Sequence, residues 1–220
     1  FGFGVNGNEF DPQLVSPGTY PISYQISSDC GDTGFFDVTV HPLPNVSFSA
    51  DIFEGCVPLL VNFTNTGDPG IACNWDFGDG NNSNSCSNAS NTFLTAGSYD
   101  VTFTLTDVNN CTNSATEFDF IEVFPLPSAN FSYTPTQSSI VDPVVYFTDL
   151  SNDAISWSWD FQIGSSTVQN PIFNFEDQGI YSVELTINSA NGCEDVIVKV
   201  IEIKDEFLIY IPNAFSANDN

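Results

Sequence analysis

The stretch Trp75-Asp76-Phe77-Gly78-Asp79-Gly80 occurs a second time, in shortened form, as Trp159-Asp160-Phe161. Other landmarks recur at nearly the same separation. They are Pro42-Leu43-Pro44 with Pro125-Leu126-Pro127, Phe63-Thr64 with Phe147-Thr148, and Tyr99-Asp100-Val101 with Tyr181-Ser182-Val183. A fixed period indicates repeated units. At this length each unit is a small domain.

Apolar and polar residues alternate along the chain. Val101, Phe103 and Leu105 are separated by threonines, which is typical of a strand with one buried face. We find no sustained helical pattern, and Gly, Pro, Asn and Asp clusters separate the alternating runs. The sequence therefore predicts an all-β chain of tandem immunoglobulin-like sandwiches. The short, proline-stiffened joints predict a head-to-tail rod.

We divide the chain into four parts. Residues 1–41 are expected to be the C-terminal part of an immunoglobulin-like domain, 42–124 and 125–204 two complete domains, and 205–220 an exit strand and linker. The predicted strands of the middle domain are 45–50, 57–65, 72–78, 81–86, 90–94, 98–107 and 116–124. Those of the last domain are 129–134, 143–149, 155–162, 167–169, 171–175, 180–188 and 195–203.

The chain is strongly acidic. It has 28 Asp and Glu against 2 Lys, for a net charge of −26, which argues against binding to nucleic acid or to an anionic membrane. No apolar run reaches the roughly 18 residues of a membrane span. Six cysteines beside so few lysines predict an oxidising, exported context. Because methionine is absent, we expect the chain to be an internal piece of a longer protein.

The W-D-F-G-D-G stretch, followed by Gly97-Ser98-Tyr99-Asp100-Val101, resembles the PKD domain family, an immunoglobulin-like sandwich. The last domain departs from the family, since Gln162-Ile163-Gly164 replaces Gly78-Asp79-Gly80. Tyr99 and Tyr181 each lie two residues after a glycine, at the start of a predicted strand. This is the place of a tyrosine corner, which ties the preceding loop to the backbone.

The end of the chain carries a second resemblance. Residues 209–216, Ile-Tyr-Ile-Pro-Asn-Ala-Phe-Ser, resemble the opening of the type B C-terminal sorting domain of Bacteroidota proteins, although Ala217 stands where proline is usual. This resemblance implies export by the type IX secretion system and attachment to the outer membrane at the cell surface. Gliding-motility adhesins share this layout.

The acidic motif has two interpretations. As a metal site, Asp76, Asp79 and Asn81 would be calcium ligands, but no bidentate glutamate follows at the spacing of an EF-hand loop. As a structural element, Asp79-Gly80 is a favoured two-residue hairpin turn. We favour the second, with Trp75 and Phe77 in the core and no cofactor.

The turn also predicts a disulfide. If Asp79 and Gly80 form the loop, Gly78 faces Asn81, and Cys73 faces Cys86 within bonding distance. Such a cross-link would contribute about 3 kcal/mol in the chain-entropy model.

The other four cysteines leave alternatives open. Cys30, Cys111 and Cys193 share the turn between the last two strands of their domains, and Cys56 lies between the first two strands. Cys56 could pair with Cys111. In immunoglobulin topology, however, these connections lie more than about 20 Å apart, at opposite ends of the sandwich. Pairing of Cys56 with Cys193 across the joint is the other alternative.

Neither the histidine of the chain nor Trp157 indicates a functional site. The lone His41 has no cysteine or carboxylate at ligand spacing, so it predicts neither a metal site nor a catalytic triad. Trp157 could offer an aromatic platform for a glycan, but large aromatic side chains are mostly buried. We therefore expect no catalytic residue.

These observations favour a non-catalytic stalk or adhesion module of a large type IX-secreted surface protein, related to gliding-motility adhesins. Its partners would be the secretion and anchoring machinery and an extracellular glycan or surface ligand. The alternative is an accessory PKD region of a secreted polysaccharide- or protein-degrading enzyme.

Overall fold

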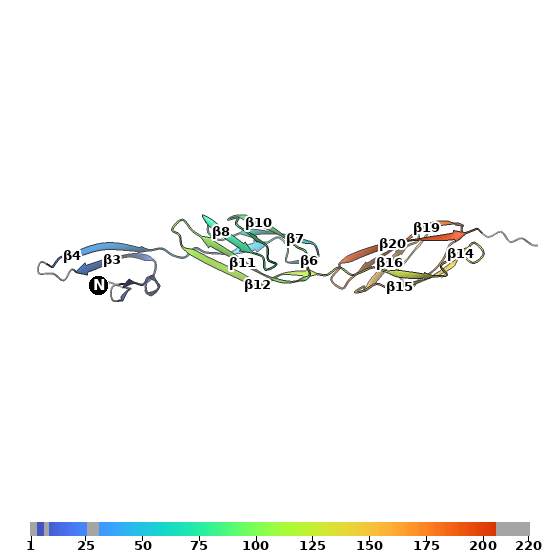
Figure 1. Cartoon of the computed structure of the whole chain (residues 1–220), viewed down its shortest axis with the longest axis horizontal. Helices are drawn as coiled ribbons and strands as arrows, with labels where there is room; N and C mark the ends of the chain where they lie inside the picture. Colours follow the sequence, from blue (N-terminus) through green and yellow to red (C-terminus); the bar gives the residue numbers. More distant parts are fainter. Residues whose placement is uncertain (1–3, 7–8, 26–30, 206–220) are drawn as a thin grey trace, which may run out of the picture. The chain divides into compact units, whose positions relative to one another are not determined.

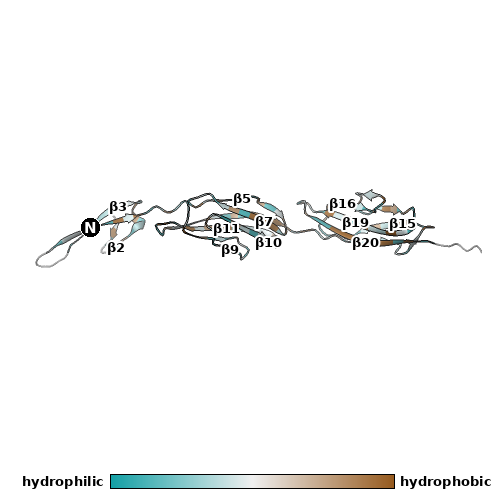
Figure 2. Ribbon diagram, turned by 90° about the horizontal axis from the view of Figure 1, so that it is seen from above, coloured by the Kyte–Doolittle hydropathy of each residue, from teal (hydrophilic) through white to brown (hydrophobic). Residues whose placement is uncertain are grey.

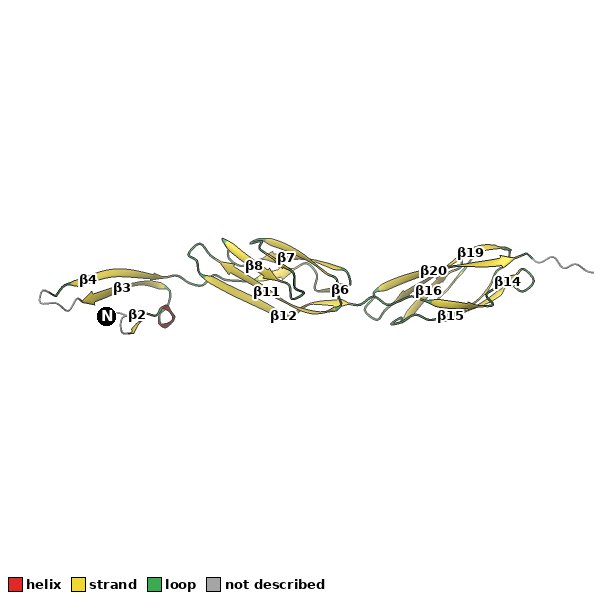
Figure 3. Ribbon diagram, viewed as in Figure 1, coloured by secondary structure: helices red, strands yellow, loops and turns green. Residues whose placement is uncertain are grey.

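The computed structural model describes residues 4–6, 9–25 and 31–205. Strands dominate, and within these ranges the helical structure is limited to one 3-10 turn, Pro12–Leu14 (Figure 3). The chain divides into two compact units between Val123 and Phe124 (Figure 1). The predicted all-β class is confirmed.

The N-terminal segment consists of two small antiparallel pairs. Strands β1 (Val5–Asn6) and β2 (Glu9–Phe10) form one, and β3 (Gly18–Gln25) and β4 (Thr33–Val40) form the other. The Tyr20 hydroxyl donates a 2.6 Å hydrogen bond to the Ser16 carbonyl, which ties the start of β3 to the preceding loop.

The middle domain is a sandwich of two sheets. One sheet has the order β10-β7-β5 and the other β6-β12-β11-β8-β9. The strands are β5 (Phe48–Ala50), β6 (Glu54–Cys56), β7 (Leu59–Asn65), β8 (Ala72–Asp76), β9 (Asn82–Ser83), β10 (Asn88–Phe93), β11 (Gly97–Thr106) and β12 (Thr112–Phe124).

The last domain repeats this arrangement. Its sheets have the orders β13-β15-β18 and β14-β20-β19-β16-β17. The strands are β13 (Phe131–Thr134), β14 (Ser138–Ser139), β15 (Val144–Asp149), β16 (Ser156–Asp160), β17 (Ser165–Ser166), β18 (Ile172–Asn174), β19 (Gly179–Asn188) and β20 (Glu194–Lys204).

Each sandwich is filled by the buried side chains of its strands. Hydrophobic and hydrophilic residues both occur along these strands (Figure 2). Trp75 and Phe77 are buried in the middle domain, and Trp159 and Phe161 are buried in the last. Trp75 stacks on Phe103 with ring centroids 4.0 Å apart. The repeated Trp-Asp-Phe therefore supplies two core side chains to each domain, with the aspartate on the opposite face.

Two short strands were missed by the sequence analysis. β6 and β14 follow the first strand of each domain and lie in the other sheet, beside β12 and β20. Their three and two residues are too few to show an alternation. The chain thus changes sheets within what sequence reasoning treated as a loop.

The predicted hairpin turn was wrong by one residue. Asp76 pairs with Asn82, and the Phe77 N–H donates to the Asn81 carbonyl at 3.3 Å, so the loop is Gly78-Asp79-Gly80. Gly78 has a φ of 77°, and a Cβ there would lie 2.5 Å from the Asp100 carbonyl oxygen. The loop has a third residue, Gly78, which allows this close approach to Asp100. The local preference of Asp-Gly for two-residue turns contains no information about this tertiary contact.

Candidate functional site

The acidic loop of the middle domain is held by a polar cluster on Asp79. One carboxylate oxygen accepts the Asn81 N–H at 2.9 Å. The other accepts the side-chain amides of Asn81 and Asn91 at 2.9 and 2.7 Å. Asn91, on β10, is only 7% exposed. Asp79 thus fastens the loop to the opposite sheet, which gives this carboxylate a structural role.

The other calcium candidates are also hydrogen-bonded within the loop. Asp76 accepts the Gly78 N–H at 3.0 Å, and the Asn81 side-chain amide donates to both Asp79 and Asn91. In the part of the chain that the structure describes, no group of three or more His, Cys, Asp or Glu side chains is arranged to hold a metal ion. Sequence reasoning missed Asn91 in this cluster.

The last domain replaces this polar cluster by aromatic packing. Its loop is a true two-residue turn, Gln162-Ile163, because the Phe161 N–H donates to the Gly164 carbonyl at 2.9 Å. Phe173 on β18 stacks on Phe161 with centroids 4.1 Å apart and lies close against Gly164. Gln162 keeps the left-handed conformation of Gly78, and its side chain accepts the Ser182 N–H.

The Cys73–Cys86 disulfide forms, with Cα atoms 5.1 Å apart. The β8–β9 register differs by one residue from the expected one. The disulfide forms nevertheless, because β9 ends at Ser83 and Cys86 approaches β8 from the segment beyond β9. The Asn65 side chain donates to the Cys86 carbonyl at 3.1 Å. The cross-link therefore fixes the segment after β9 against β8, the strand of the core tryptophan.

The last domain has a hydrogen-bonded cluster where the middle domain has this disulfide. Trp157 lies two residues before its core tryptophan, as Cys73 does, and its indole N–H donates to Asp149 at 2.7 Å. The Gln169 amide donates to the same carboxylate oxygen at 3.0 Å. Asp149 closes β15 as Asn65 closes β7. Two hydrogen bonds to one carboxylate thus occupy the place of one covalent bond.

The Asp149 carboxylate accepts hydrogen bonds from Ser151, Trp157 and Gln169. Partial burial raises the pKa of its carboxyl, but hydrogen bonds from Ser151, Gln169 and Trp157 outweigh this effect and leave the pKa below its ordinary value. The carboxylate is therefore ionised in the folded domain at neutral pH. Sequence reasoning missed both Asp149 and Gln169.

Trp157 is half-buried, and its ring packs against the core of the last domain. Its indole N–H is also bonded to Asp149. The environment matches the expectation that this tryptophan packs in the sandwich. It leaves only part of the ring for a ligand.

The tyrosine corners take the expected form. The Tyr99 hydroxyl donates to the Thr95 carbonyl, and the Tyr181 hydroxyl donates to the Asp177 carbonyl, both at 2.8 Å. Each bond reaches four residues back and ties the start of the long strand to the loop before it. These tyrosines hold the fold.

Cys111 carries a free thiol, so the Cys56–Cys111 alternative does not form. Cys111 immediately precedes β12, whereas β6, which ends at Cys56, lies beside the far end of β12, where the Glu122 N–H donates to the Phe53 carbonyl. The strand between the two places has 13 residues, or about 40 Å at the usual rise. Pairing of Cys56 with Cys193 stays a prediction, and Cys30 lies outside the described residues.

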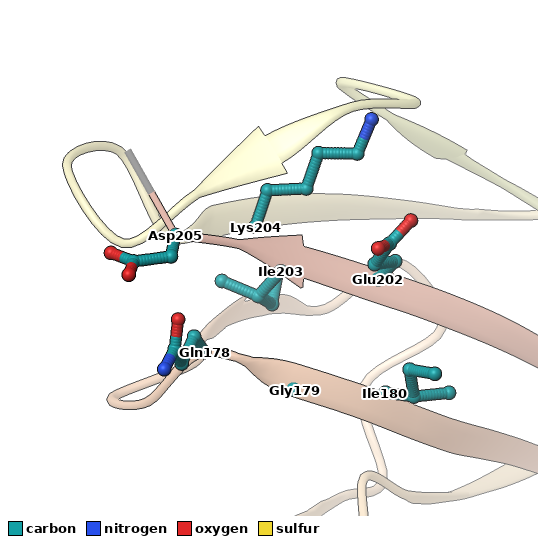
Figure 4. A pocket seen from close by; sticks show the side chains of 7 residues that line it. All are labelled: Gln178, Gly179, Ile180, Glu202, Ile203, Lys204 and Asp205. Carbon is teal, nitrogen blue, oxygen red and sulfur yellow. The ribbon is translucent and has the colours of Figure 1, made fainter. Parts of the chain in front are cut away.

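An open depression of about 480 Å³ lies at the end of the β19–β20 ladder. Gln178, Glu202, Lys204 and Asp205 contribute its polar side chains. In Figure 4 the Asp205 side chain is directed away from those of Lys204 and Glu202. They do not converge on a common point, as an acid, a base and a nucleophile would.

The model of the PKD domain family matches residues 39–123 and 125–204, which is most of the chain. The chain belongs to the PKD domain family. PKD domains are typically non-catalytic immunoglobulin-like modules. No helix in the described part of the chain is long and apolar enough to cross a membrane.

Several solved structures are similar. The PKD1 domain of the Vibrio cholerae metalloprotease PrtV is 25% identical, with a TM-score of 0.32, over 36% of this chain and 96% of that one. The PKD1 domain of Vibrio anguillarum Epp is 21% identical, with a TM-score of 0.33, over 37% and 96%. A Ca²⁺-stabilised ice-binding adhesin of an Antarctic bacterium is 12% identical, with a TM-score of 0.44, over 86% and 57%.

Proposed function

We propose that this chain is a non-catalytic stalk or adhesion module of a large cell-surface protein that is exported by the type IX secretion system, of the gliding-motility adhesin kind. Two consecutive PKD domains carry the proposal. Each fills its sandwich with aromatic side chains and ties its loops with internal bonds. The function of such modules is to separate a binding region from the cell and to resist unfolding.

The clusters of polar side chains support a structural function. Asp79, Asn81 and Asn91 bond to one another, and Asp149 receives Trp157 and Gln169. A hydrolytic site needs a carboxylate, an imidazole or a nucleophile that is directed into a cleft. In both domains these groups are instead used to connect strands.

Export and anchoring rest on the sequence of residues 209–216, which lies outside the described residues. Its resemblance to a type B sorting domain makes the type IX machinery the expected partner and the outer membrane the expected site of attachment. The Cys73–Cys86 disulfide agrees with an extracellular location. A surface glycan or protein is the expected ligand of the complete adhesin.

Surface labelling tests the proposal. An antibody raised against residues 42–204 should label intact cells of the source organism, and protease added outside the cells should remove the antigen. In a strain without the type IX translocon the antigen should stay inside the cell. Antigen that remains internal in wild-type cells would overturn the proposal.

The same antibody distinguishes the adhesion module from the alternative, an accessory region of a secreted enzyme. The captured full-length protein should have no polysaccharide- or protein-degrading activity. Activity that copurifies with the antigen, and that disappears when the gene is deleted, would identify this region as an accessory part of a secreted enzyme.

A further inference from the structure

Strand β20 of the last domain has an incomplete set of neighbours. β19 pairs with it from Glu194 to Ile203, whereas on the other side β14 pairs only with Ile203 and Lys204. Within the ranges that the structure describes, no strand pairs with residues 194–202 on this side (Figure 1). A stretch of sheet edge is therefore open.

The backbone groups at this edge belong to the valines. The Ser189 N–H donates to the Cys193 carbonyl at 2.8 Å, and the β19–β20 register continues from there without a shift. Because hydrogen-bonded and non-hydrogen-bonded pairs alternate, the N–H and C=O groups of Val196, Val198 and Val200 point away from β19. Lys204 lies an even number of residues from these valines, so its carbonyl also points away from β19. It accepts a hydrogen bond from the Ile140 N–H, just after β14.

The side chains of these valines form an exposed apolar row. Val196, Val198 and Val200 are 44%, 51% and 59% exposed, and they alternate with inward-facing Ile197 and Lys199. β-branched side chains favour strand pairing. An open edge with such a row is a template for another strand.

Inward-pointing charges are one protection of edge strands, but the two on this stretch, Asp195 and Lys199, are already bonded within the domain. Lys199 turns inward, where its ammonium group bonds to the Asn130 side chain and the Phe131 carbonyl and lies over the Phe131 ring. It is therefore not extended across the edge. Asp195 likewise accepts the Ala129 N–H.

β12 of the middle domain provides a contrast. Its register with β11 shifts between Tyr99 and Val101, and Asp119 has a φ of 50°. Such a bulge interrupts an edge and prevents pairing along its length. β20 pairs with β19 over ten consecutive residues without an interruption.

We propose that the β20 edge binds an extended segment of another protein, which adds as an antiparallel strand along residues 194–202. The segment has apolar side chains opposite the valines and Lys or Arg at its two ends. Glu194 and Glu202 flank the valine row on the exposed face, and Glu184 lies across from Val198 on β19. Opposite charges placed across strands stabilise the pairing and set its register.

A second copy of the chain fits this edge poorly. Antiparallel pairing of two β20 strands about Val198 sets Glu194 of each copy against Glu202 of the other. Like charges directly opposite are destabilising. The net charge of −26 on each copy adds a long-range repulsion. Charge therefore selects a basic partner strand.

The experiment titrates the full chain with a synthetic peptide as long as Glu194–Glu202. The peptide has lysine at both ends and valine at its third, fifth and seventh positions, with serine or threonine between. Amide hydrogen exchange at Val196, Val198 and Val200 should slow about tenfold or more near saturation, because these N–H groups gain partners. Amides of β12 should not change.

Two variants test the site. Val198→Pro removes an N–H that points away from β19, so the ladder stays intact while binding is abolished. Glu194→Gln with Glu202→Gln should weaken the peptide roughly two- to thirtyfold for two charge pairs. The matched control is Thr116→Pro on the β12 edge, which should leave binding unchanged. A peptide with terminal glutamates should bind less than the lysine peptide.

Several results would overturn the proposal. They are no slowing of the three valine amides, binding that survives Val198→Pro in a folded protein, or equal binding of the lysine and glutamate peptides. Self-association that Val198→Pro abolishes would assign the edge to a second copy. If Val198→Pro does not fold, the glutamine double variant still decides the question.

Discussion

At the scale of single residues, the two PKD domains stabilise the same loop in different ways. The middle domain joins Asp79 to Asn91, and the last domain stacks Phe173 on Phe161. The hydrogen bond of the middle domain needs both Asp79 and Asn91, because a buried amide without its acceptor loses its hydration and gains no hydrogen bond in return. The loss of Gly-Asp-Gly in the last domain and the change from asparagine to phenylalanine thus belong together.

We predict that Asp79→Ala destabilises the middle domain by about 1–3 kcal/mol, since the buried Asn91 amide loses its acceptor. Amide hydrogen exchange of β10 and β11 in the full chain measures this change domain by domain. Glu117→Ala removes the same charge from an exposed side chain and should change stability by less than about 0.5 kcal/mol. Equal effects of the two variants would contradict the structural role of Asp79.

Asp149 makes the stability of the last domain depend on pH in the acidic range. Its pKa is lowered in the folded state, so its contribution is complete above the unfolded pKa, near 3.8, and is lost as the pH falls through the lower folded pKa. We predict that Asp149→Asn is less stable than the parent at neutral pH. The difference should shrink below a pH of about 4 and disappear once Asp149 is protonated.

Hydrogen exchange of β16 amides across this pH range measures the difference. The middle domain serves as an internal reference, because Asp149→Asn should leave β8 unchanged. A difference between the two proteins that stays constant down to a pH of about 2 would show that Asp149 acts without its charge.

At the scale of elements, the disulfide of the middle domain and the Asp149 cluster of the last domain do the same work. Each joins the segment that follows the hairpin, which contains Cys86 or Gln169, to the strand of the core tryptophan. We predict that Cys73→Ala with Cys86→Ala costs about 3 kcal/mol, because the cross-link spans 13 residues and restricts the unfolded chain.

Urea unfolding without reductant, followed by amide exchange in β8, measures this cost. Cys111→Ala is the matched control, since it removes a cysteine that forms no cross-link, and it should change stability by less than about 1 kcal/mol. A double variant as stable as the control would mean that the disulfide adds nothing.

The long elements could be predicted from the sequence, and the short ones could not. β11 alternates from Tyr99 onward and β19 along its length, and their buried faces are the expected ones. β6 and β14 contain no alternation to detect, and their sheet is chosen by tertiary packing. Asn91, Asp149 and Gln169 were missed for a related reason, because their partners lie on distant strands. A position-by-position comparison of the two repeats would have pointed to them.

At the scale of the whole molecule, the cysteines between domains offer a test. With Cys111 free, the remaining sequence-based alternative for Cys56 is Cys193. We predict that a non-reduced digest contains the Cys56 peptide linked to the Cys193 peptide, and that reduction separates them. Cys73 linked to Cys86 serves as the internal control of intact disulfides. A Cys56 peptide of unlinked mass would refute the pairing.

Charge is the other property of the whole chain. With 28 acidic and 2 basic residues, self-repulsion opposes the compact state, and salt should relieve it. Raising NaCl from about 0.01 to 1 M shortens the Debye length from about 30 to 3 Å, so the melting temperatures in calorimetry should rise. Choline chloride should raise the melting temperatures equally if screening is the cause.

Calcium and magnesium at equal ionic strength should have the same effect on the melting temperatures, because the Asp79 carboxylate is already bonded to Asn81 and Asn91. A larger effect of calcium would instead restore Asp76, Asp79 and Asn81 as ligands.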